Sequence, residues 1–225
     1  MKHIPYYSLF LFAGTLLLSA CGGSETEAPA EETPAAEAPA PAPTCKYSYD
    51  NSTTKAYWTA YKHTDKVEVK GTFDSLEVVQ AAITDQPQDL LNGATFSIFT
   101  GSVNSSDATR DQKIVNFFFG KMTGGEVLTG SLSDVNGSAD SGTVSVSLMM
   151  NGVENKLEGH YAIEGEELSL RADFDFNNWN AQASLDALQK ACAEKHTGKD
   201  GVTKFWPEGK ILIRTTIKKE CDTAS

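Results

Sequence analysis

The chain has 225 residues, of which 19 are Lys or Arg and 30 are Asp or Glu, so its formal net charge is −11. An acidic balance without a basic stripe argues against a nucleic-acid-binding protein, favours solubility and opposes adhesion to anionic lipid surfaces. The stretch 45–225 is about the size of one domain, so a single folded domain is expected there.

Residues 1–20 have the pattern of a bacterial secretion signal. No charged residue occurs between Lys2 and the small residues that end the apolar core. The sequence LSAC at 18–21 resembles the lipobox of bacterial lipoproteins, in which the cysteine is acylated, for example with palmitate, and becomes the new N-terminus. A permanent transmembrane helix is the alternative, but the apolar run is short for ~20 spanning residues and no basic cluster follows. We therefore expect lipidation at Cys21.

Residues 21–44 comprise the lipidated cysteine and a linker rich in Pro, Ala and Glu. Such a composition has no apolar face to bury, so an unfolded and fairly extended spacer is expected. Gly22 and Gly23, and no aspartate, follow the cysteine. By analogy with other lipoproteins this favours an anchor in the outer membrane. The expected location is the bacterial cell envelope, with the domain facing the periplasm or the cell surface.

Three further cysteines lie in the domain. Cys45 and Cys221 stand near its two ends, and the compartment outside the inner membrane permits disulfides. We expect a Cys45–Cys221 bridge with Cys192 free, although other pairings stay open because connectivity does not follow from sequence. Cys192 and His196 lie four residues apart on an expected helix, but no second ligand pair has zinc spacing. Neither a metal site nor a cofactor is predicted.

The pattern inside the domain is mostly β. In 167–176, apolar residues alternate with polar ones, as in a strand that buries one face. Asn151-Gly152 predicts a two-residue hairpin turn, and Glu164-Gly165 marks the next turn. Eight strands are expected, near 54–63, 66–73, 94–103, 126–133, 143–150, 153–163, 167–176 and 210–219.

Two short helices interrupt the strands. Ser106 is expected to cap a helix through 107–119, and 181–195 is rich in helix formers. Eight antiparallel strands with alternating faces predict a mainly β fold, either a sandwich or a closed barrel. A barrel of that size removes exposed edges and can hold one small apolar ligand.

From Trp58 onward the chain resembles the YceI-like domain family. The most specific match is Arg110-Asp111 followed closely by Phe117-Phe118. Met122-Thr123-Gly124-Gly125 replaces the aromatic-proline step common in the family. The matching segments are 58–73 (WTAYKHTDKVEVKGTF), 102–122 (SVNSSDATRDQKIVNFFFGKM), 128–133 (LTGSLS), 150–152 (MNG) and 204–215 (KFWPEGKILIRT).

The resemblance implies a lipocalin-like antiparallel eight-stranded β-barrel that binds a long apolar molecule, such as a polyisoprenoid or a fatty-acid derivative. Family members are often dimers. A long tail would gain ~0.8 kcal/mol for each buried CH₂ group, and methionines adapt to an irregular chain. The candidate pocket residues are Phe73, Phe96, Ile98, Phe117, Phe118, Met122, Val146, Leu148, Met150, Leu170, Phe174, Trp179 and Ile213.

The alternative is a barrel filled by its own side chains, with a structural or interaction role and no ligand, because alternating apolar residues also build a solid core. Arg110 and Asp111 are expected at the pocket mouth, where Arg110 would meet a polar head group. Pairing of Arg110 with Asp107, and a backbone turn held by Asp111, form the favoured structural alternative. No nucleophile–base motif is visible, so an enzyme is not predicted.

Overall fold

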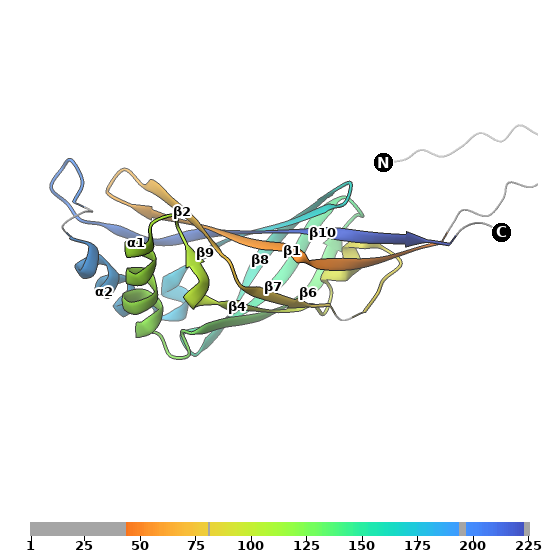
Figure 1. Cartoon of the computed structure of the whole chain (residues 1–225), viewed down its shortest axis with the longest axis horizontal. Coiled ribbons are helices and arrows are strands. Elements are labelled where there is room, and N and C mark those ends of the chain that lie inside the picture. The colour runs from red at the N-terminus through yellow and green to blue at the C-terminus, as the bar shows by residue number, and fades with distance from the viewer. Residues whose placement is uncertain (1–43, 81, 194–196, 223–225) are drawn as a thin grey trace, which may run out of the picture. The chain divides into compact units, whose positions relative to one another are not determined.

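The computed structural model describes residues 44–80, 82–193 and 197–222 (Figure 1). The expected signal at 1–20, the lipidation site Cys21, the linker up to residue 43 and His196 lie outside the described residues. Within the described ranges, no helix combines the length and the apolar character needed to cross a membrane.

The described part of the chain is mainly β, as predicted. Its strands form one antiparallel sheet in the order β3-β4-β6-β7-β8-β9-β10-β1-β2-β5. The eight expected strands are all present with shifted ends, whereas β3 and β5 were not predicted. The ten strands are β1 (Cys45–Lys62), β2 (Val67–Phe73), β3 (Leu76–Val79), β4 (Thr95–Phe99), β5 (Val103–Asn104), β6 (Val127–Gly137), β7 (Ser141–Met150), β8 (Val153–Glu164), β9 (Glu167–Asp175) and β10 (Phe205–Cys221).

Both expected helices are present and both are shorter than predicted. The first is α1 (Ala108–Lys113), which continues as a π-helical segment η3 (Ile114–Phe118) and a 3₁₀ turn η4 (Phe119–Lys121); the second is α2 (Gln182–Cys192). Short 3₁₀ turns complete the described elements: η1 (Pro87–Leu91), η2 (Thr100–Ser102) and η5 (Phe176–Trp179). The prediction that Ser106 caps the first helix is wrong. Asp107 is the cap, because its carboxylate accepts a hydrogen bond from the backbone N of Arg110 at 3.1 Å.

The sheet curls into a half-barrel with β3 and β5 at its edges. The seam between β1 and the β3 region is closed by an isolated backbone bridge between Tyr47 and Thr84 and by side-chain hydrogen bonds. Asn51 Nδ2 donates to Val78 O at 2.8 Å, and the backbone N of Tyr49 donates to Gln80 Oε1 at 2.9 Å. The mainly β barrel-like fold with two helices is therefore confirmed, with ten strands instead of eight and one seam without a continuous ladder.

The two predicted hairpin turns are confirmed. Asn151 and Gly152 have φ angles of 51° and 68° and join β7 to β8, while Gly165, with φ of 63°, joins β8 to β9. In the Asn151-Gly152 turn, left-handed backbone at both central residues gives a twist that matches that of the strands. Adjacent long strands are thereby held in register, and their inward faces form the barrel wall.

The disulfide Cys45–Cys221 ties the first strand to the last, which confirms the predicted pairing. The two cysteines are opposite each other in the β1–β10 ladder. Cys192 is free and buried.

A bulge in β1 changes which residues face inward. Asp50 is opposite Thr216 and Lys55 is opposite Arg214. Four residues of β1, 51–54, therefore lie opposite a single residue of β10, Thr215. The inward set of β1 therefore changes from odd-numbered residues before the bulge to even-numbered residues after it.

Candidate functional site

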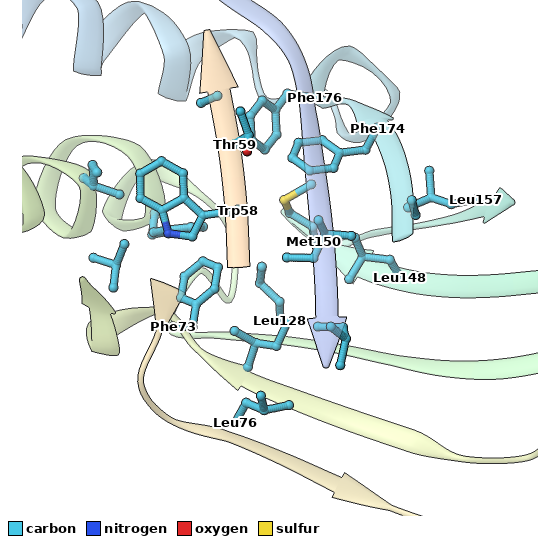
Figure 2. Close-up of a pocket in the computed structure, with 18 of the residues that line it drawn as sticks. Trp58, Thr59, Phe73, Leu76, Leu128, Leu148, Met150, Leu157, Phe174 and Phe176 are labelled. Atoms are coloured by element: carbon cyan, nitrogen blue, oxygen red, sulfur yellow. The ribbon is translucent and has the colours of Figure 1, made fainter. Parts of the chain in front are cut away.

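A cavity of about 230 Å³ lies inside the curl of the sheet (Figure 2). On the same measure ~15 Å³ is enough for one water molecule, so this space is far larger than a packing defect. Its wall is built mostly from aliphatic and aromatic side chains of the strands and of the segments α1, η3, η4, η5 and α2. Such a surface offers a hydrocarbon contact and little directional chemistry.

Most of the candidate pocket residues line this cavity. They come from β2, β4, β7, β9, β10 and η3, which are far apart in the sequence and brought together by the curl of the sheet. The lining candidates are Phe73, Phe96, Ile98, Phe118, Val146, Leu148, Met150, Leu170, Phe174 and Ile213.

Three candidates do not line the cavity. Phe117 is 39% exposed, because the helical turn directs Phe118 and Phe119 inward and leaves Phe117 outside. Trp179 is fully buried, and its Nε1 donates to Leu148 O at 3.0 Å, which holds the indole within the protein core. Met122 is also buried in that core, away from the cavity surface.

Several lining residues were absent from the predicted set. Figure 2 shows Trp58 of β1, Leu76 of β3, Leu128 of β6, Leu157 of β8 and Phe176 of η5 around the cavity. Alternation in the predicted strand 54–63 could have identified Trp58. Leu76 lies on a four-residue strand too short to give a periodic pattern.

Aromatic rings form a continuous edge-to-face series along one wall. The ring centroids of Phe174 and Phe176 are 4.8 Å apart, as are those of Phe118 and Phe176. The series continues from Phe118 to Phe119 at 5.1 Å and from Phe119 to Phe73 at 6.0 Å. This geometry is favourable for aromatic pairs and fixes the wall without polar groups.

Glycines on neighbouring strands make room for three cavity-lining rings. A Cβ atom at Gly209 would lie 2.4 Å from the Phe174 ring, and one at Gly71 would lie 2.4 Å from the Trp58 ring. A Cβ atom at Gly130 would likewise lie 2.3 Å from the Phe96 ring. The rings therefore occupy space that a side chain at these three positions would take.

Most polar atoms of the cavity wall form hydrogen bonds with other groups of the protein. Tyr49 Oη donates to Leu90 O at 2.7 Å, and Trp58 Nε1 donates to Thr72 O at 3.2 Å. The Thr215 hydroxyl is 2.6 Å from that of Thr54. Burial also raises the pKa of Tyr49, so its phenol stays protonated. These groups form the wall as neutral, satisfied side chains.

The two ends of the cavity differ in exposure. Its inner end is walled by buried residues such as Leu91 (1% exposed) and Leu168 (2% exposed). At the other end Lys62, Leu188 and Trp206 line it while remaining half-buried. The mouth therefore lies at the end covered by α1 and α2 (Figure 1).

Arg110 lines the cavity and Asp111 does not. The guanidinium of Arg110 donates from Nε to Ser105 Oγ at 2.7 Å and from Nη2 to Ser105 O at 2.5 Å. Asp111 accepts hydrogen bonds from the backbone N of Ser105 at 2.9 Å and from its hydroxyl. The three residues thus fix the turn before α1, and Arg110 presents its side chain to the cavity from that anchored position.

Cys192 belongs to the cavity wall near the mouth. Burial raises the pKa of its thiol, while the positive charges of Lys113 and Lys62 act in the opposite direction. The thiol is therefore mostly protonated at neutral pH and contributes to the wall as a small apolar group. Among the described residues, no cluster of three or more His, Cys, Asp or Glu side chains is placed to hold a metal ion.

No family model and no curated protein matches this sequence. Solved structures do match. A polyisoprenoid binding domain from Saccharophagus degradans, implicated in plant cell wall breakdown, is 12% identical; the match has a TM-score of 0.53 and covers 80% of this chain and 100% of that one. BcnA from Burkholderia cenocepacia is also 12% identical, with a TM-score of 0.51 and coverage of 76% and 99%. The YCEI protein of Campylobacter jejuni is 16% identical, with a TM-score of 0.44 and coverage of 72% and 89%.

The chain has the YceI-like fold. The resemblance found in the sequence motifs is thus confirmed for the fold. At these identities the YceI-like fold is what the structures share, and the ligand has to be argued from the cavity of this chain.

Proposed function

We propose that this protein binds one long, flexible apolar molecule, a polyisoprenoid or a fatty-acid derivative, inside the barrel. The observation that carries the proposal is the cavity of about 230 Å³, lined by hydrocarbon side chains and open at one end. An apolar chain that enters such a space gains ~0.8 kcal/mol for each buried CH₂ group and needs no specific polar partner. The name of the similar S. degradans structure, a polyisoprenoid binding domain, supports the same chemical class.

We further propose that the protein carries or stores this molecule in the bacterial envelope, anchored through lipid on Cys21. The support is the lipobox-like sequence at 18–21 together with the Cys45–Cys221 bridge. Disulfides persist in compartments outside the cytosol, which agrees with an envelope protein.

The alternative is a structural lipoprotein with a filled barrel and no ligand. Interiors of folded proteins are packed nearly as densely as organic crystals, and voids larger than a water molecule are few. A cavity of this size that opens beside half-buried aromatic residues favours the binding role. A catalytic role has less support, because the wall is hydrocarbon and its polar atoms bond to the protein.

Native mass spectrometry of the full chain, purified from its bacterial host, tests the proposal. We expect one co-purifying lipid per chain, released by organic solvent and rebound on addition of a long prenol or fatty acid. Repeated recovery of empty protein that rebinds neither compound would contradict the proposal.

A pair of variants locates the bound chain. Ala60→Phe fills the cavity from β1, and Thr129→Phe places the same ring on an exposed position of β6. Only Ala60→Phe should reduce lipid retention, by about tenfold or more, since losing two buried CH₂ contacts costs ~1.6 kcal/mol. Equal retention by the two variants would place the lipid outside the barrel.

A further inference from the structure

Two segments that are far apart in the sequence form one surface at the mouth of the cavity. We call this surface the basic tip; it comprises the β1–β2 hairpin at 62–67 and the segment 197–208, which includes the first residues of β10. The backbone N of His63 donates to Lys204 O at 2.8 Å, and Trp206 Nε1 donates to His63 O at 2.6 Å. Both segments lie at the same end as α2 (Figure 1).

The indole of Trp206 is close to two lysines at the basic tip. The Nζ atom of Lys204 is 3.5 Å from the centroid of the indole ring, and that of Lys66 is 4.2 Å from it. The same ring lines the cavity and is half-buried. An apolar surface thus continues from the cavity to the outside, with two positive charges beside it.

The basic tip combines exposed apolar side chains with lysines and a smaller number of carboxylates. Val67 and Val202 are 41% and 45% exposed. Two of the carboxylates have partners within the basic tip: Glu208 pairs with Lys66 at 3.2 Å, and Asp200 accepts a hydrogen bond from the backbone N of Val202 at 3.0 Å. The four lysines of the surface are Lys62, Lys66, Lys199 and Lys204, and its three acids are Asp65, Asp200 and Glu208. The basic tip therefore carries a net charge of +1 in a chain whose net charge is −11.

We propose that the basic tip docks onto an anionic phospholipid surface and places the mouth of the cavity against the bilayer. Tryptophan and lysine are favoured at membrane interfaces, because each combines an apolar body with a polar end. A lysine near an anionic leaflet strengthens partitioning onto that leaflet by about fivefold. Acidic groups elsewhere on the domain are screened beyond ~8 Å at physiological ionic strength, so they orient the protein without preventing contact at the tip.

Docking of the basic tip rests on the proposed function, since it gives an apolar molecule a route between bilayer and cavity that avoids water. The chain enters the domain at Thr44, at the start of β1, whereas the tip lies at the end of that 18-residue strand. The residues between Cys21 and Thr44 can span up to ~75 Å, more than the ~60 Å of such a strand. A lipid anchor at Cys21 therefore leaves the tip able to reach the same membrane.

Vesicle co-sedimentation of the full chain carrying Cys21→Ser, which removes the acceptor thiol for lipid, tests the docking. The vesicles are phosphatidylcholine with or without phosphatidylglycerol. The variant Lys66→Ala/Lys204→Ala removes two tip charges. Its matched control, Lys156→Ala/Lys210→Ala, removes two charges from exposed positions of β8 and β10. Every protein keeps the same N-terminal segment, so the comparison isolates the tip.

We expect the tip variant to partition about tenfold more weakly than the parent chain onto vesicles with phosphatidylglycerol, and the control variant to partition as the parent does. Added salt should weaken the partitioning of the parent chain. Equal partitioning of the two double variants would overturn the docking.

Retention of a long prenol, measured by native mass spectrometry without vesicles, separates the two proposals. Loss of prenol retention in the tip variant would place these lysines in the ligand site and would overturn the docking. A parent chain that docks on vesicles but retains no prenol contradicts only the proposed function.

Discussion

The two ends of the barrel interior are built from the same strands and differ in how they are filled. At the closed end, Leu90 and Leu91 of η1 pack against Val144, Leu168 and other buried residues, leaving each of these four side chains no more than 2% exposed. At the mouth, α1, η3 and α2 cover the sheet with half-buried residues such as Ile114 and Leu188, which border the cavity. Alternating strands therefore supply an apolar inner face, and the segment laid across that face decides between a solid core and a cavity.

Removing the disulfide at the closed end has the largest expected effect. Cys45→Ala/Cys221→Ala frees two strands that are joined across 176 residues. The free energy of unfolding should fall by ~3–5 kcal/mol, because the unfolded chain regains conformational freedom. Urea unfolding measures the change, with Cys192→Ala as a control that keeps the bridge. At urea concentrations below its unfolding transition, the Cys45→Ala/Cys221→Ala variant should still retain lipid. Loss of lipid under these conditions would show that the closed end shapes the site.

Leucines at the two ends should respond differently to truncation. Leu168→Ala at the closed end should lower the free energy of unfolding by ~3 kcal/mol, since the site is fully buried. Leu188→Ala at the mouth should lower it by ~1 kcal/mol, because the side chain is half-buried beside open space. Urea unfolding of both variants gives the difference. Similar losses at the two positions would remove the distinction between core and mouth.

A methyl group at Gly209 should push the Phe174 ring into the cavity. Its Cβ atom would lie 2.4 Å from the ring, and the ring borders the open space of the cavity. We expect Gly209→Ala to cost ~1 kcal/mol of stability and to weaken lipid retention. Gly101→Ala is the matched control, because no atom lies within 4 Å of the added methyl. Unchanged retention in Gly209→Ala would mean that the ligand does not contact this wall.

The smallest effect concerns the thiol at the mouth. Because burial raises the pKa of Cys192, alkylation by a maleimide should be slow at neutral pH and should accelerate as the pH rises above the ordinary range of a thiol. A lipid in the cavity should slow it further, since Cys192 belongs to the wall. The mass shift of the protein over time measures both effects. Alkylation at equal rates with and without lipid would contradict occupation of the mouth.

Long alternating strands and the two glycine turns could be predicted from the sequence, because each repeats a simple pattern over many residues. The strands β3 and β5 could not, since four and two residues carry no period. The β1 bulge reverses the inward set, so the position of Tyr49 on the inner face was not visible. Ser106 and Asp107 are both suitable caps for the first helix. Asp107 is the cap in the structure, whereas Ser106 has a left-handed backbone with φ of 62°, and the sequence pattern does not decide between the two.

The candidate site was predictable as a set of inward residues and not as a cavity. Alternation identifies Phe174 and Leu170 as inward, but whether they meet other side chains or open space depends on the elements across the barrel. Phe117 and Trp179 show the limit of the pattern. Both are aromatic and close to lining residues, yet one is exposed and the other is bonded into the core.

Met149 and Met150 offer the most direct test, because these neighbours lie on opposite faces of β7. Met150 lines the cavity and is 3% exposed, whereas Met149 is 38% exposed on the outside. Photo-crosslinking of the full chain with a long-chain lipid carrying a diazirine, followed by peptide mass spectrometry, reports which face the lipid contacts. Adducts at Met150, Leu157 and Phe174, with none at Met149, are the result we predict. Adducts confined to Met149 and other outward residues would contradict a ligand inside the barrel.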